Sequence, residues 1–242
     1  MARSESKIFE ALLLDGKGGA RPLEENDVKE WQPADGTLWI DLNLSNKSAR
    51  KWLRDNQFIS PGAADILLAA ETRPRSLPHG DGIIVVMRGI NMNPGAVPDD
   101  MVAIRMWLQK DLIVTSRRRR VLSIRDVRDA LLGGAGPAST GQFLVMLTGA
   151  LAGRIEAAVE NIENVLEEIS ERLGAGDIET VRTDLGIVRR QAAVIRRHLA
   201  PQRDALDRLA RAPSGLLSES ETFDLREEGD HLTRHIEDLD LA

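Results

Sequence analysis

The sequence contains no cysteine and no tyrosine among its 242 residues, and only four phenylalanines and four tryptophans. Without cysteine, the chain can form no disulfide, no thiolate zinc site and no thiol nucleophile. The few aromatic rings leave little surface for stacking on bases. The net charge of −6 opposes binding to the phosphate backbone. We therefore expect no nucleic acid partner.

Long hydrophobic runs and catalytic motifs are also absent. No apolar segment follows Met1-Ala2-Arg3-Ser4, as a secretory signal would require. The longest weakly polar run, at 142–153, is shorter than the ~20 residues that span a bilayer. As given, the chain is expected to be soluble and cytoplasmic. It has no phosphate-binding loop, no HExxH motif and no serine with a suitably spaced histidine, so we expect that it is not an enzyme.

Apolar residues with a 3.5-residue period dominate the chain from Ser139 onward. Gly174-Ala175-Gly176 interrupts the period, and Asp177 is a suitable N-cap for its continuation. The pattern predicts an antiparallel hairpin of two long helices, with Pro201 kinking or interrupting the second. With Thr148 as one polar member, the two series are Leu144, Leu151, Ile155, Val159, Ile162, Leu166, Ile169 and Leu173, then Val181, Leu185, Val188, Ala192, Ile195 and Leu199.

A third helical series follows the break at Pro213-Ser214-Gly215. Residues 218–242 carry nine acidic and two basic side chains, a net charge of −7, which favours a position beside cations. The chain ends at Ala242 without a glycine, proline or capping residue. We therefore expect this helix to be cut short and the sequence to be part of a longer protein. The apolar members of the series are Leu225, Leu232, Ile236 and Leu239.

The first 132 residues alternate between strand and helix patterns. Apolar and β-branched runs predict strands at 7–14, 37–42, 82–90, 102–108 and 112–115, with a turn at 15–19. Helices are predicted at 47–56, from Pro61 to Arg73-Pro74-Arg75, and at 122–132. The first of them should have its N-cap within 43–45, with Trp52 and Leu53 facing inward.

These patterns predict a fold of the α+β or α/β class. Residues 1–137 should form an α/β/α domain with a mixed sheet, 138–213 the long antiparallel helical hairpin, and 214–242 the start of a stalk helix.

Opposite charges flank the two series of the hairpin. Pairing of glutamates with arginines would fix the register of the two helices. Alternatively, both sets are solvated faces in which each pair contributes a few tenths of a kcal/mol. The two sets are Glu156, Glu160, Glu163, Glu167, Glu168 and Glu171, and Arg182, Arg189, Arg196 and Arg203.

Several motifs, each weak alone, recur in a specific order: Trp39-Ile40-Asp41-Leu42, Asp65-Ile66-Leu67, Glu71-Thr72-Arg73-Pro74-Arg75 and Leu225-Arg226-Glu227-Glu228-Gly229-Asp230-His231-Leu232. Over essentially its whole length, the chain resembles the cytoplasmic domain of CorA-type divalent-cation transporters. Further motifs resemble the zinc-transport (ZntB-like) branch of that family: His79-Gly80-Asp81-Gly82, Arg88-Gly89-Ile90-Asn91 and Asp99-Asp100-Met101-Val102.

The resemblance implies a homopentamer in the bacterial inner membrane, with this part of the chain on the cytoplasmic side. In such proteins an α/β/α funnel and a helical hairpin precede a stalk helix, which leads into two membrane spans with a Gly-Met-Asn pore motif. That membrane region is missing here, so we expect the fragment to associate more weakly. Met92-Asn93 directly follows a predicted strand and is not the pore motif.

Four residues are candidate metal ligands. His231 and His235 are spaced i, i+4 on one helical face beside carboxylates, an arrangement that suits Zn²⁺. The alternative is that this spacing occurs by chance and the histidines only pack. Asp65 and Asp230 match positions that resemble an inter-subunit cation site of the CorA family, where they would bind Mg²⁺ or Zn²⁺. The alternative for Asp65 is a solvated helix surface.

Arg117-Arg118-Arg119-Arg120 follows a predicted strand and opens a helix. We expect this basic cluster either to bind anions or the inner membrane surface, or to be a solvated turn compensated by the acidic stalks.

Two functions are therefore considered. The first is the cytoplasmic funnel domain of a divalent-cation transporter for zinc. The second is a soluble helical interaction or sensor module without transport activity.

Overall fold

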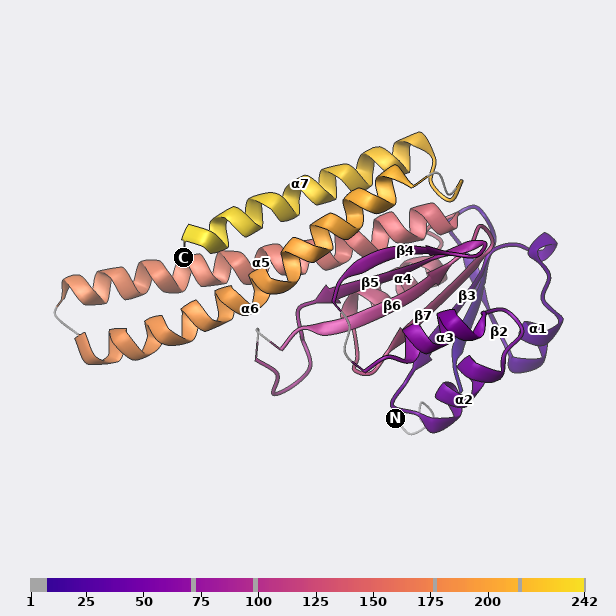
Figure 1. The fold of residues 1–242 in the computed structure, drawn as a ribbon, viewed down its shortest axis with the longest axis horizontal. Coiled ribbons are helices and arrows are strands. Elements are labelled where there is room, and N and C mark those ends of the chain that lie inside the picture. The colour runs from indigo at the N-terminus through magenta and orange to yellow at the C-terminus, as the bar shows by residue number, and fades with distance from the viewer. Residues whose placement is uncertain (1–7, 71–72, 98–99, 176–177, 213–214, 242) are drawn as a thin grey trace.

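The computed structural model describes residues 8–70, 73–97, 100–175, 178–212 and 215–241 (Figure 1). Within these ranges a seven-stranded sheet has the order β2-β1-β3-β7-β6-β5-β4. The strands are β1 (Glu10–Leu14), β2 (Ala20–Leu23), β3 (Leu38–Asn43), β4 (Arg75–His79), β5 (Gly82–Gly89), β6 (Val102–Leu108) and β7 (Leu112–Arg117). The helices are α1 (Glu25–Glu30), the 3-10 helix η1 (Pro33–Asp35), α2 (Lys47–Asp55), α3 (Pro61–Leu68), α4 (Leu122–Leu132), α5 (Thr140–Gly174), α6 (Ile178–Arg211) and α7 (Glu219–Leu241).

The sheet is mixed and is covered on both faces. β3 and β7 are parallel, and the other neighbouring strands are antiparallel. Alternate residues of β1 show why its sequence is apolar from Ala11 onward, since Ala11 and Leu13 belong to one buried cluster and Leu12 and Leu14 to another. Side chains of α2 and α3 complete the first cluster, and those of α4 to α7 complete the second. The predicted mixed sheet in an α/β/α arrangement is confirmed.

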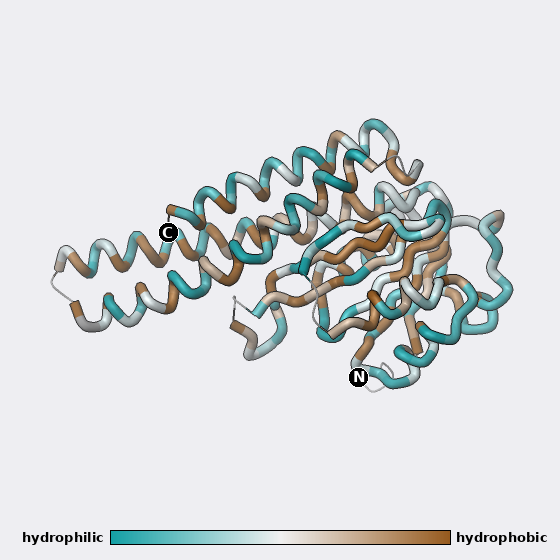
Figure 2. Tube along the Cα trace, in the orientation of Figure 1, coloured by the Kyte–Doolittle hydropathy of each residue, from teal (hydrophilic) through white to brown (hydrophobic). Residues whose placement is uncertain are grey.

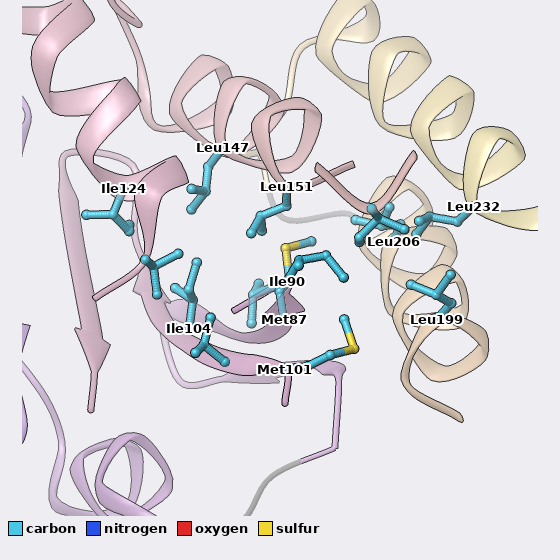
Figure 3. Close-up of a cluster of buried hydrophobic side chains, with 14 of the residues drawn as sticks. Met87, Ile90, Met101, Ile104, Ile124, Leu147, Leu151, Leu199, Leu206 and Leu232 are labelled. Atoms are coloured by element: carbon cyan, nitrogen blue, oxygen red, sulfur yellow. The ribbon is translucent and has the colours of Figure 1, made fainter. Parts of the chain in front are cut away.

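The second cluster extends without a break from the sheet into all three long helices. Figure 3 shows Met87 and Ile104 of the sheet beneath Leu151 of α5, with Leu199 of α6 and Leu232 of α7 alongside. The close approach of α5 needs a glycine, because a Cβ at Gly89 would lie 2.6 Å from Cδ2 of Leu151. The core is therefore continuous across the predicted boundary at residue 137.

The predicted helical hairpin consists of α5 and α6. Ser139 caps α5 by accepting a hydrogen bond from the backbone N–H of Gln142 at 3.0 Å. The predicted apolar series are buried along most of both helices. Apolar and polar residues alternate along these helices, as the brown and teal of Figure 2 show. The tip extends beyond the sheet and beyond the end of α7 (Figure 1). Towards that tip Leu173 is 54% exposed, although it follows the same period.

Helix α7 returns along the hairpin and runs parallel to α5 (Figure 1). Its first turn is fixed to the start of α5 through Glu221, whose carboxylate accepts hydrogen bonds from Ser139 Oγ at 2.9 Å and from the backbone N–H of Ser218 at 2.7 Å. A Cβ at Gly141 would lie 2.3 Å from Glu221 Oε2, so a glycine lets this carboxylate approach the α5 backbone. The four predicted apolar residues of α7 are all buried.

Of the helices in the described ranges, α5 alone is long and apolar enough by composition to cross a membrane. The run predicted at 142–153 is shorter, because Arg154 and Glu156 follow it. The core helix of a globular protein meets the same criterion. Here Phe143, Leu147 and Leu151 are buried in the cluster that covers the sheet, which explains the apolar composition of α5.

Some local predictions were wrong or incomplete. The sequence patterns did not predict β2, β4, α1 or η1. The N-cap of α2 is Asn46 rather than a residue within 43–45, and α3 ends at Leu68, before Arg73-Pro74-Arg75. Helix α6 continues through Pro201 without interruption. The predicted breaks at Gly176, Asp177, Pro213 and Ser214, and the motif residues Glu71, Thr72 and Asp99, lie outside the described residues.

The predicted charge pairing of the hairpin was also wrong in detail. Between the arms, the ion pair in the described part of the chain joins Arg172 of α5 to Asp184 of α6 at 2.7 Å, with the opposite polarity. Arg196 pairs with Asp240 of α7, and Arg203 pairs with its neighbour Asp204. The apolar period correctly identified the charged positions that flank the seam of the hairpin. It did not show that α7 would compete for pairing with those charges.

We predict that Leu151→Ala lowers the free energy of unfolding by about 2–5 kcal/mol, because it leaves a cavity between α5 and Gly89. Leu173→Ala, at a later position of the same apolar series, is the matched control and should change it by no more than about 0.5 kcal/mol. Urea denaturation measures both values. Equal losses in the two variants would contradict the burial that the structure assigns to them.

Candidate cation site on the last helix

Helix α7 has one buried face and one acidic face. Leu225, Leu232, Ile236 and Leu239 pack into the core with α5 and α6. The opposite face is exposed, and like charges along it repel each other unless cations or a basic surface compensate them. Its exposed acidic residues are Glu219, Asp224, Glu227, Asp230, Glu237 and Asp240.

The four predicted metal ligands lie on two separate helices. Asp230 is exposed on α7, while His231 and His235 of the same helix are partly buried. Asp65 is exposed on α3, which lies on the other side of the molecule from α7 (Figure 1). The described residues contain no group of three or more His, Cys, Asp or Glu side chains placed to hold a metal ion. Within one chain, therefore, these four do not form a complete coordination sphere.

His235 and Glu228 are partly buried where α7 packs on α5. Burial lowers the pKa of His235, although the charges of Glu156 and Asp238 act in the opposite direction. Burial likewise raises the pKa of Glu228, whose Oε2 has no hydrogen-bond partner. Both groups are thus pushed towards their neutral forms, and neutral imidazole is the metal-ligating form of histidine.

The proximity of Glu156 to these groups was not predicted from the sequence. Its charge acts on the pKa of both His235 and Glu228, although it belongs to α5. Part of this information was visible in the sequence, because Glu156 directly follows Ile155, a member of the apolar series. The parallel alignment of α7 on α5 was needed to bring the two segments together, and periodicity does not specify it.

A second buried titratable group lies where α6 packs on the sheet. His198 Nδ1 is buried without a hydrogen-bond partner. Burial lowers the pKa of His198 to about 4, and the positive charges of Arg88, Arg197 and Arg73 act in the same direction. Nearby, the backbone N–H of Arg88 donates to Gln202 Oε1 of α6 at 2.7 Å. A proton on His198 would therefore weaken the contact between α6 and the sheet.

The four consecutive arginines have four different environments. Arg117 pairs with the buried Asp41 at 2.8 Å, and Arg118 donates to the carbonyl of Leu68 at the end of α3 at 2.9 Å. Arg119 pairs with Asp100, and Arg120 is exposed. Within one chain, the partners of the first three lie on or next to the α/β part rather than on the acidic last helix.

Comparison with known proteins identifies the family. Residues 34–242 match the family model described as CorA-like Mg2+ transporter protein. The chain belongs to the CorA family. Its ZntB-like character is shown by curated relatives named "Zinc transport protein ZntB". One, from Enterobacter sp. (strain 638), is 33% identical over 95% of this chain and 69% of its own length. Another, from Pectobacterium carotovorum subsp. carotovorum (strain PC1), is 30% identical over 98% of this chain and 71% of its own length.

Three solved structures have the same fold. The full-length CmaX protein matches with a TM-score of 0.90 and 31% identity over 99% of this chain and 75% of that one. The ZntB cytoplasmic domain from Vibrio parahaemolyticus matches with a TM-score of 0.82 and 26% identity over 96% of this chain and 90% of that one. The CorA magnesium transporter from Methanocaldococcus jannaschii, 16% identical with a TM-score of 0.80 over 98% of this chain and 73% of that one, shows the fold alone.

The pKa of His198 predicts a pH-dependent stability. Between pH 6.5 and about 4, the unfolded chain binds a proton at this histidine that the folded chain does not bind. The contribution of His198 to stability is therefore present above this window and is lost as the pH falls through it. In His198→Gln, the free energy of unfolding from urea denaturation should fall less steeply over the window. The same slope in both proteins would contradict the assignment.

Proposed function

We propose that this chain is the cytoplasmic part of a divalent-cation transporter that moves zinc across the bacterial inner membrane. The observation that carries the proposal is the identity of 33% over 95% of the chain to a protein named for zinc transport. The likeness to the cytoplasmic domain of a ZntB protein supports it. Because the relatives are named as transport proteins, the protein is proposed to be a transporter rather than an enzyme.

The three predicted parts have distinct roles in this proposal. Residues 1–137 form the wall of a funnel, 138–213 the hairpin that braces it, and 214–242 the stalk helix that leads to a membrane region. In a homopentamer, five copies of the acidic face of α7 would attract divalent cations towards the funnel axis. The exposed carboxylates of Asp224, Glu227 and Asp230 support this role.

Asp65 and Asp230 are proposed to act between copies of the chain rather than within one. Both are exposed, and they lie on different sides of a single chain, so a cation held by both requires two neighbouring chains. Zn²⁺ or Mg²⁺ bound in this way would hold the copies together and report the cation concentration. His231 and His235 are proposed as further ligands on α7.

Zinc flux through the full-length protein in proteoliposomes tests the transport proposal. A zinc-dependent flux that exceeds that of empty vesicles is expected. A protein that assembles in the membrane but conducts neither Zn²⁺ nor Mg²⁺ would favour the sensor alternative instead.

Association of the chain tests the proposed inter-subunit site. We expect Zn²⁺ or Mg²⁺ to promote association in sedimentation velocity, and Asp230→Asn or Asp65→Asn to weaken it by about tenfold, the effect of losing ~1.4 kcal/mol of contact energy. Asp224→Asn, which removes the same charge from the same face of α7, is the matched control. Equal weakening in the control would indicate general electrostatics rather than a site.

Zinc titration calorimetry tests the two histidines. His231→Ala and His235→Ala should each reduce the heat or the affinity of zinc binding, because each removes an imidazole ligand. Identical titrations of both variants and the parent chain would remove the histidines from the proposal and leave the transport function untouched.

A further inference from the structure

A cavity of about 710 Å³ lies between α4 and the strands β1, β2 and β3. Its volume is within the ~300–1,000 Å³ typical of small-molecule sites. It reaches the ends of β3 and β7, where the parallel partners Asn43 and Arg117 lie side by side. In sheets with parallel strands, ligands bind outside the carboxyl ends of those strands. The position of the cavity is therefore one that ligands use.

One wall of the cavity is apolar. Leu12 and Trp39 line it from the sheet, and Val121 and Ile124 line it from α4. Trp39 is held in place from both sides. Its ring packs against Phe143 with centroids 4.8 Å apart, and its Nε1 donates to Thr115 Oγ1 at 3.1 Å. This wall is preformed and suits a ring or a short hydrocarbon chain.

Most of the charged residues in the lining are basic. Four arginines line the cavity against two carboxylates, those of Glu10 and Asp41, in a chain whose net charge is −6. Both carboxylates are already paired. Asp41 accepts hydrogen bonds from Thr115 Oγ1 at 2.7 Å and from Arg117 Nε at 3.0 Å, and Glu10 pairs with Arg128 at 3.2 Å. The four arginines are Arg117, Arg120, Arg125 and Arg128.

Two of these arginines have a positive charge that the carboxylates around them do not fully neutralise. Arg125 shares Asp129 with Arg128, so one carboxylate serves two guanidinium groups. The side chain of Arg120 forms no ion pair or hydrogen bond within the described residues, although it lines the cavity. Guanidinium groups suit carboxylate and phosphate oxygens, which they bind through paired N–H donors.

We propose that this cavity binds a small soluble organic anion, a carboxylate or phosphate ester with an apolar ring or short chain. The anionic group binds Arg120 and Arg125, and the apolar body lies along Leu12, Trp39 and Ile124. A half-open concave space of this size favours a single small molecule over the flat surface of a membrane. The inference does not depend on the proposed transport function.

The first test uses two fluorescent probes that differ in charge. 8-Anilinonaphthalene-1-sulfonate has an anionic group on an apolar ring system, and N-phenyl-1-naphthylamine has the rings without the sulfonate. We expect saturable binding of the sulfonate at one site per chain, at least about tenfold tighter than the neutral probe, which corresponds to the ~1.4 kcal/mol or more that charged hydrogen bonds add. Circular dichroism should show that the chain stays folded during the titration.

Variants of the arginines locate the site. Arg120→Gln and Arg125→Gln should each raise the dissociation constant of the sulfonate about fivefold or more and leave the neutral probe unchanged. Arg182→Gln, an exposed position on α6, removes the same charge elsewhere and is the matched control. Leu132 lines the cavity and is 53% exposed, so Leu132→Trp should obstruct it and weaken both probes.

Three results would overturn the proposal. One is the absence of saturable sulfonate binding to the folded chain, and another is an equal effect of Arg120→Gln and Arg182→Gln. The third comes from flotation with phosphatidylglycerol vesicles. If the chain binds these vesicles, if Arg120→Gln abolishes that binding, and if octanoate does not compete with the sulfonate probe, then the arginines serve a lipid surface rather than a soluble anion.

Discussion

The structure depends on one continuous apolar core between the sheet and the three long helices. Alternate residues of the strands form one side of this core, and the periodic residues of α5, α6 and α7 form the other side. Because Gly89 has no side chain, Leu151 can lie directly on β5. The hairpin is therefore part of the folding unit that contains the sheet. Burial of this shared surface is the main favourable term for the position of every helix on that face.

Because of this shared core, the two faces of α7 have different environments. The inner face is fixed by apolar packing and by Glu221 at its first turn, so the axis of the helix is defined by the core. The outer face keeps its carboxylates in water. A cation or a neighbouring chain that approaches this face meets a surface whose position is set by the fold of the whole chain. This fixed position of the acidic face is the physical basis on which the proposed cation binding would depend on the arrangement of the α/β part.

The sequence predicted the long helices and the central strands well, because both have strong periodic patterns. The series from Leu144 to Ile169 and the apolar run in β5 left few alternatives. The edge strands were missed for a physical reason. Pro22 in β2 and Pro78 in β4 weaken the strand pattern, and proline is tolerated there because an outer edge has no further strand to pair with.

The candidate sites could be predicted only in part. The identity and spacing of His231 and His235 were visible in the sequence, but a helix period does not specify which neighbouring helix supplies Glu156. Likewise, Arg117-Arg118-Arg119-Arg120 was recognisable as a basic cluster. The four arginines contact Asp41, the end of α3, Asp100 and an open cavity, respectively. This arrangement depends on long-range strand pairing, which no local pattern encodes.

The tip of the hairpin extends past both the sheet and α7, so two helices there have only each other for support. Isolated helix pairs bury little surface, and local stability decreases where burial decreases. Amide protons near Leu173 should therefore exchange with solvent long before those near Leu151. Protection from exchange should therefore increase along the hairpin from Leu173 towards its base on the sheet.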